Sequence, residues 1–122
     1  MSTTRAQKVE ERLRAIISEV ALQEVKDPRM GFLTITGVEV TADLRFAKVY
    51  VSVFGQDRDK KRSLAALESA KGFIRRRVGE EGNLRFVPEL AFAIDETAEE
   101  TQKVTGILQR LRQEQDKERG AS

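Results

Sequence analysis

Residues 33–53 read LTITGVEVTADLRFAKVYVSV, two alternating stretches joined by a short polar segment. In the second stretch an alanine and three valines alternate with Lys48, Tyr50 and Ser52, which predicts a strand with one buried and one solvated face. In the first stretch the apolar phase changes after Gly37, which indicates a β-bulge. Asp43 is a turn-forming residue in the connection. Together these features predict a β-hairpin.

A helix is predicted before the hairpin. Thr4 and Gln7 have the spacing of a capping box, in which the side chain of each residue bonds the backbone of the other. Apolar residues then recur at helical spacing, namely Val9, Leu13, Ile16, Ile17 and Val20. We expect the helix to end at Asp27-Pro28, because a residue that precedes proline is pushed out of the helical region.

A second helical pattern covers residues 58–79, and Gly72 interrupts it. A glycine there either marks a kink or is simply tolerated, at a cost of about 1 kcal/mol relative to alanine. Residues 79–83 are predicted to form a turn, and residues 90–94 alternate as a third strand. A final helix is expected from Asp95 or Thr97, with apolar positions at Val104, Ile107, Leu108 and Leu111.

The expected order is α-β-β-α-(kink)-α-β-α, which is an α+β fold in a single domain over residues 5–111. Because crossover connections are right-handed, the third strand should lie parallel to the second. This predicts a three-stranded mixed sheet, order 1-2-3, with helices packed on one face. Residues 1–4 and 113–122 are expected to be flexible termini. Among the aromatic residues, Phe54, Phe86 and Phe92 are predicted core positions, and Tyr50 is expected to be the only one on a solvated strand face.

The composition argues against catalysis. The 122 residues include no cysteine and no histidine, so thiol chemistry and the commonest general base and metal ligand are missing together. We therefore expect no catalytic residues, no metal and no cofactor. The sequence contains no apolar run long enough to cross a membrane and no apolar leader near its first residue. We therefore expect a monomeric cytoplasmic protein that has no membrane partner and no small-molecule substrate.

Four segments resemble the ribosome-binding factor A family of bacteria: 26–29 (KDPR), 47–52 (AKVYVS), 72–75 (GFIR) and 84–92 (LRFVPELAF). The resemblance is collinear from about residue 5 to residue 111. It implies a type II KH fold and a non-catalytic assembly factor for the free 30S small ribosomal subunit, with 16S rRNA and nearby ribosomal proteins as partners. It further implies a role in late maturation, in processing of the rRNA 5′ end, and in growth in the cold. The family has an alanine-x-glycine kink between two helices, and Ala70-Lys71-Gly72 fits it.

Basic residues are concentrated near this kink. Residues 58–77 hold eight basic side chains and two acidic ones, whereas residues 80–100 hold one basic and seven acidic. Such a cationic surface attracts polyanions, although solvated helix faces have the same composition. The candidate RNA-binding residues are Lys71, Gly72, Arg75, Arg76 and Arg77 at the kink, with Arg5, Lys8 and Arg12 on the first helix as a second group. We do not assign phosphate binding to Gly79-Glu80-Glu81-Gly82, because its two carboxylates would repel phosphate.

Two other functions fit parts of the sequence. A KH-like protein-interaction module could use the acidic C-terminal segment to bind a basic ribosomal or assembly partner. A magnesium-dependent nuclease is disfavoured, because the carboxylates of residues 95–100 are sufficiently explained as the first turn of a helix.

Overall fold

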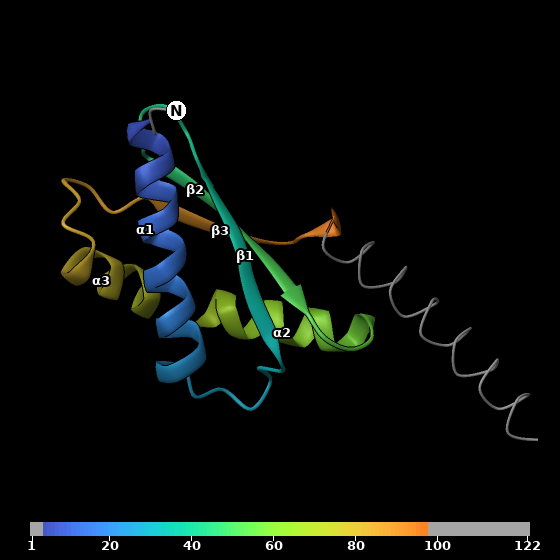
Figure 1. Cartoon of the computed structure of the whole chain (residues 1–122). Coiled ribbons are helices and arrows are strands. Elements are labelled where there is room, and N and C mark those ends of the chain that lie inside the picture. Colours follow the sequence, from blue (N-terminus) through green and yellow to red (C-terminus); the bar gives the residue numbers. More distant parts are fainter. Residues whose placement is uncertain (1–3, 98–122) are drawn as a thin grey trace, which may run out of the picture.

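The computed structural model describes residues 4–97 (Figure 1). Its elements are α1 (Arg5–Glu19), the π-helical turn η1 (Val20–Glu24), β1 (Leu33–Val40), β2 (Phe46–Val53), α2 (Asp57–Ser69), α3 (Lys71–Glu81) and β3 (Glu89–Ile94). The predicted α+β order is confirmed as far as β3. The predicted final helix lies largely outside the described residues, as do residues 1–3 and 113–122. Within them, the Asp95 carboxylate accepts the backbone N–H of Thr97 at 3.0 Å, as a capping residue would.

The sheet has the predicted order β1-β2-β3, with β1 antiparallel and β3 parallel to β2. The register shifts between Ile35 and Gly37, which confirms the bulge inferred from the change of phase. In the hairpin connection, Asp43 accepts hydrogen bonds from the Thr41 hydroxyl at 2.6 Å and from the backbone N–H of Arg45 at 3.1 Å. The predicted turn former therefore acts as expected.

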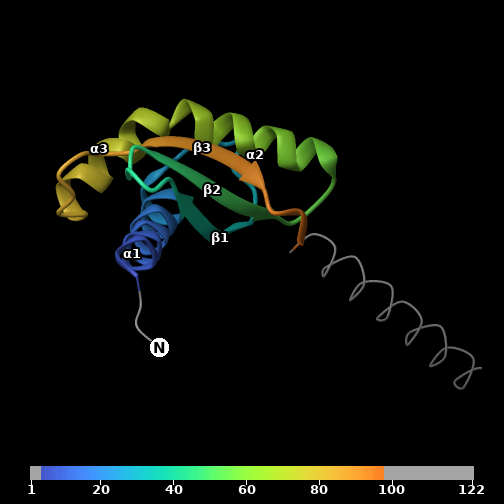
Figure 2. The ribbon, with the colours of Figure 1, turned by 90° about the horizontal axis from the view of Figure 1, so that it is seen from above.

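The helices cover one face of this sheet, with α1 along β1 and α2 along β3 (Figure 2). Alternate residues of the strands point into the core beneath them and are almost fully buried, for example Val49, Val51 and Leu90. They meet the buried side chains of the helices, which include Leu13, Ile17, Leu67, Ile74 and Val78. No helix within residues 4–97 covers the opposite face, where Lys48 is exposed and lies over the ring of Tyr50.

The predicted helix of residues 58–79 is two helices that meet at a single residue, Ala70. Its φ of −89° and ψ of 0° end the regular geometry of α2. The backbone N–H of Ala70 bonds back to Ala66 and Leu67, while its own carbonyl accepts the N–H of Ile74 at 2.9 Å. The kink over Ala70-Lys71-Gly72 is thus confirmed, and its hinge is the alanine. Gly72 lies in the first turn of α3, and a Cβ placed on it would meet no atom within 4 Å.

The prediction of a turn over residues 79–83 is wrong for its first half. Helix α3 continues to Glu81, and the chain turns at Gly82 and at Asn83, which has a φ of 53°. The extension has a local cause. Arg77 pairs with Glu80 and Glu81, three and four residues further along the same helix, which stabilises its last turn.

The prediction of a core position is wrong for two of the three phenylalanines. Phe54 is 77% exposed and Phe86 is 69% exposed, whereas Phe92 packs against the core as expected. Phe54 follows β2 in the phase of Lys48 and Tyr50, so alternation turns it away from the core. The prediction that Tyr50 is the only aromatic on a solvated strand face also fails, because Phe46, the first residue of β2, is 57% exposed.

Candidate RNA-binding surface

The kink between α2 and α3 packs against the chain that connects η1 to β1. A shallow hollow there is lined by Glu24, Val25, Lys26, Asp27, Ala66, Ser69, Ala70 and Phe73. Arg29 fixes this arrangement. Its guanidinium contacts the Asp27 carboxylate at 2.7 Å and donates to the Ser69 hydroxyl at 3.0 Å, while its backbone N–H donates to Asp27 at 2.9 Å. Arg29 therefore ties the connecting turn to the end of α2.

The charge of this turn is set by the same contacts. Hydrogen bonds from the side chain and the backbone of Arg29 lower the pKa of Asp27 to about 2, with a smaller contribution from the nearby positive charge of Arg62. Asp27 is consequently ionised at neutral pH and is paired with Arg29. Arg29 supplies most of the interaction with this carboxylate, and Arg62 contributes only through its nearby charge.

Three cations around the hollow are exposed and form no ion pair within residues 4–97. They are Lys26 on the hollow's rim, Arg62 one turn before Ala66, and Arg76 on α3. The guanidinium of Arg76 lies over the ring of Phe73, 5.4 Å from its centroid, so that it is held beside the hollow. We name Lys26, Arg62 and Arg76 the kink surface. An unpaired exposed cation binds phosphate without first giving up a carboxylate partner.

The structure separates the basic residues predicted at the kink into those that have acidic or backbone partners and those that have none in the described part of the chain. Lys71 pairs with Glu68 at 2.7 Å in an ion pair that is partly exposed, which is a weak interaction that a phosphate can replace. Gly72 is exposed beside it. Of the three consecutive arginines, only Arg76 is free of acidic partners within residues 4–97.

Arg75 and Arg77 stabilise the fold. Arg75 donates to the carbonyls of Pro88 and Val87 at 3.0 and 3.1 Å, which ties α3 to the start of β3. Arg77 contacts Glu24 of η1 at 3.1 Å and Glu80 at 2.6 Å, and it also pairs with Glu81. These hydrogen bonds and charges raise the pKa of Arg77. A phosphate would have to compete with these partners for either side chain.

The first-helix group lies apart from the kink. Arg12 donates to the carbonyl of Glu81 at 2.9 Å and so caps the end of α3. Arg5 and Lys8 are exposed and form no ion pair within the part of the chain that the structure describes. Arg5 lines a second hollow with Arg85 and Phe86. Along the helix axis it is separated from Glu24 by roughly 28 Å, at about 1.5 Å per residue. These cations therefore form two separate groups: one is Arg5 with Lys8, and the other is the kink surface.

The predicted RNA-binding residues include neither Lys26 nor Arg62. Arg62 belongs to the basic run 58–62, and that run was the available signal. No group of three or more acidic side chains that could hold a metal ion occurs in residues 4–97. None of the helices described is long and apolar enough to span a membrane.

Comparison with known proteins supplies the remaining evidence. The model of the family described as ribosome-binding factor A matches residues 5–108. The chain belongs to this family. A ribosome-binding factor A of Citrifermentans bemidjiense is 50% identical over 107 residues, which cover 88% of this chain and 90% of that protein.

Solved structures of ribosome-binding factor A support the same conclusion. The crystal structure of the protein from Thermus thermophilus matches with a TM-score of 0.66 at 25% identity, covering 75% of this chain and 97% of the other. A homology model of the Thermus thermophilus factor, fitted into a cryo-EM map of its complex with the 30S subunit, matches with a TM-score of 0.62 at 26% identity, covering 74% and 93%. The fold described above is thus the fold of the family.

Proposed function

We propose that this protein binds the small ribosomal subunit and contacts phosphates of its 16S rRNA through the kink surface. The observation that carries the proposal is the set of three unpaired cations around a helix kink, in a member of the ribosome-binding factor A family. The 30S complex described for the Thermus thermophilus factor supports the choice of partner. Lys71 and the exposed backbone at Gly72 extend the surface, and Arg5 and Lys8 supply a second point of contact.

The chemistry of these groups favours recognition of folded RNA by shape and charge. Arginine and lysine contacts to phosphate position a protein on RNA and carry little sequence information. Base stacking would need a row of exposed aromatic rings, and Phe73 is half-buried beneath Arg76. The action of the protein is one of binding, since the family is a non-catalytic ribosome assembly factor. Its roles in late maturation, in 5′-end processing and in growth in the cold are part of the proposal and rest on the family resemblance.

Arg75, Arg77 and Arg12 are proposed to act through the fold. Arg75 bonds the backbone just before β3, Arg77 pairs α3 with η1, and Arg12 caps the end of α3. Together they fix the orientation of α3, from which Arg76 projects. Replacing one of them is expected to weaken binding only to the extent that it destabilises the domain.

Sedimentation through a sucrose gradient tests the partner. The purified protein is mixed with small subunits, large subunits and assembled ribosomes and is then located by immunoblotting. We expect co-migration with free small subunits. Binding to 16S rRNA stripped of proteins is measured in parallel, because association that depends only on ribosomal proteins would favour the protein-interaction module instead.

Paired variants test the surface. Arg76→Ala and Arg62→Ala each remove one unpaired cation, and both are expected to weaken subunit binding while the thermal unfolding midpoint stays constant. Arg58→Ala is the matched control, because Arg58 is also exposed on α2 but lies about 18 Å along the axis from Ala70. Equal losses from all three variants would show that only net charge matters, which contradicts a role for the kink.

A further inference from the structure

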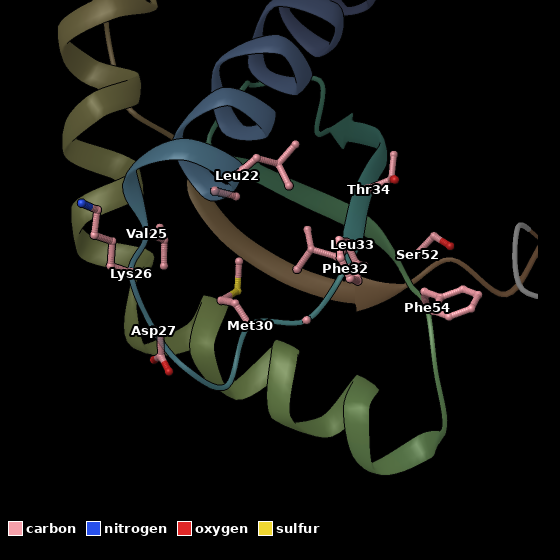
Figure 3. A pocket seen from close by; sticks show the side chains of 12 residues that line it. Leu22, Val25, Lys26, Asp27, Met30, Phe32, Leu33, Thr34, Ser52 and Phe54 are labelled. Carbon is pink, nitrogen blue, oxygen red and sulfur yellow. The ribbon is translucent and has the colours of Figure 1, made fainter.

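An apolar groove at one end of the sheet is not used by the proposed function. Phe32 precedes β1 and Phe54 follows β2, and the two are joined by a backbone hydrogen bond of 2.9 Å from Phe54 to Phe32. Their side chains are 85% and 77% exposed, and Leu22 of η1 is 58% exposed. These three, with Met30, surround a groove of about 530 Å³ (Figure 3).

Exposure on this scale indicates an interaction. Single apolar side chains are common on protein surfaces, but several large ones gathered around one hollow mark a site that another apolar surface covers. Each phenylalanine has roughly 150–250 Å² of surface to bury, at roughly 25 cal/mol per Å². Polar groups at the rim, including Lys26, Asp27 and Thr34, would remain accessible beside an occupant.

The chain leaves the described domain beside this groove. Ile94, the last residue of β3, pairs with Val51 of β2, and the backbone N–H of Asp95 donates to the carbonyl of Val51 at 2.8 Å. The next residue of β2, Ser52, lines the groove. The Asp95 carboxylate also accepts the hydroxyl of Thr36 at 2.6 Å, which anchors this exit point on β1. The residues that follow Thr97 therefore start within a few residues of the groove's wall.

The residues after Thr97 include apolar side chains at helical spacing, which could cover the apolar groove. Val104, Ile107, Leu108 and Leu111 stand at i, i+3, i+4 and i+7, so one face of a helix would present all four. The reach is sufficient. Val51, beside which the chain leaves the sheet, is three residues of extended chain from Phe54, which is about 10 Å. The seven residues from Thr97 to Val104 span about 10 Å as a helix and up to about 23 Å when extended, so Val104 can reach the groove.

We propose that the groove around Leu22, Phe32 and Phe54 is the docking site of the protein's own C-terminal segment, residues 98–111. The segment inserts Val104, Ile107, Leu108 and Leu111 into the groove. Lys26 and Asp27 line both this groove and the hollow at the kink, so the docked segment lies next to the kink surface. A second copy of the chain or a partner protein are the alternative occupants.

A spin label tests this directly, because the chain has no cysteine and one engineered cysteine is unique. Gln109→Cys places the label opposite the apolar stripe, so that the stripe is left intact. In full-length, ¹⁵N-labelled protein we expect the label to broaden the amide signals of Leu22, Phe32 and Phe54 selectively. The same label in an Ile107→Asp/Leu108→Asp variant is the control, and there the broadening should be lost.

The alternatives give different results. Absence of broadening in the intact protein would overturn the proposal. Broadening that appears when spin-labelled ¹⁴N protein is mixed with unlabelled ¹⁵N protein would identify a second copy as the occupant and would also overturn it. Broadening of the ¹⁵N signals of Phe32 and Phe54 by an added small subunit carrying a label, without any effect of Gln109→Cys, would assign the groove to a ribosomal partner.

Discussion

Replacing Gly72 by alanine separates the two roles that a glycine at the kink could have. The residue is in the first turn of α3, its φ is not positive, and a Cβ added to it would meet nothing within 4 Å. The methyl group therefore costs no strain, and alanine reduces the entropy of the unfolded chain. We expect Gly72→Ala to stabilise the domain by about 0.5–1 kcal/mol. For a domain of this size that corresponds to a rise of about 2–6 °C in the unfolding midpoint.

Thermal and urea unfolding followed by circular dichroism measure this change. Gly82→Ala is the internal control, because its Cβ would lie 2.6 Å from the carbonyl oxygen of Val78, so that this variant should be destabilised. Subunit co-sedimentation is measured on the same proteins. If an RNA backbone approaches Gly72 closely, the alanine variant is more stable and binds more weakly. A lower unfolding midpoint for Gly72→Ala would refute the reasoning, because it would mean that this position resists a side chain.

Three further predictions concern stability and charge. Arg77→Ala should lower the unfolding midpoint, because it leaves Glu24, Glu80 and Glu81 without their partner. The salt dependence of subunit binding should stay constant in this variant. A changed salt dependence would show that Arg77 contacts RNA. The pKa of Asp27 falls from 3.8 to about 2, so its stabilising contribution is complete above about pH 4 and is lost as the pH falls toward 2. Asp27→Asn should therefore flatten the fall in urea midpoint over that range, and an unchanged pH profile would contradict this. Leu67→Ala removes a fully buried side chain and should cost about 2–5 kcal/mol in urea unfolding, whereas a cost below about 1 kcal/mol would mean that the core is packed otherwise.

Local patterns predicted most of the fold. The capping box at Thr4, the bulge at Gly37 and the turn at Asp43 are interactions between residues close in sequence, and each is present as expected. The parallel placement of β3 followed from the handedness of crossovers, which holds for any sequence of this order. The errors at Phe54 and Phe86 came from placing both residues at apolar-phase positions. Phe54 instead has the phase of Lys48 and Tyr50, on the opposite face of β2.

The site was harder to predict, because its electrostatics depend on distant residues. Arg77 is the last of three consecutive arginines, yet its partner Glu24 is 53 residues earlier in the chain. Arg75 bonds carbonyl groups that only the folding of β3 brings within reach. The sequence therefore predicts where basic residues are concentrated, but tertiary structure decides which of these cations stay without an ion pair.

The salt dependence of small-subunit binding tests the role of the kink surface most directly. Binding constants of the intact protein and of a Lys26→Ala/Arg62→Ala/Arg76→Ala variant are compared over a range of salt concentrations. Each phosphate contact releases counterions and contributes roughly 0.7–0.9 to the slope of log affinity against log salt. The variant should therefore bind more weakly, with a slope smaller by about 2–2.7 and an unchanged unfolding midpoint. A variant with the affinity and the slope of the intact protein would contradict the assignment of rRNA phosphates to the kink surface.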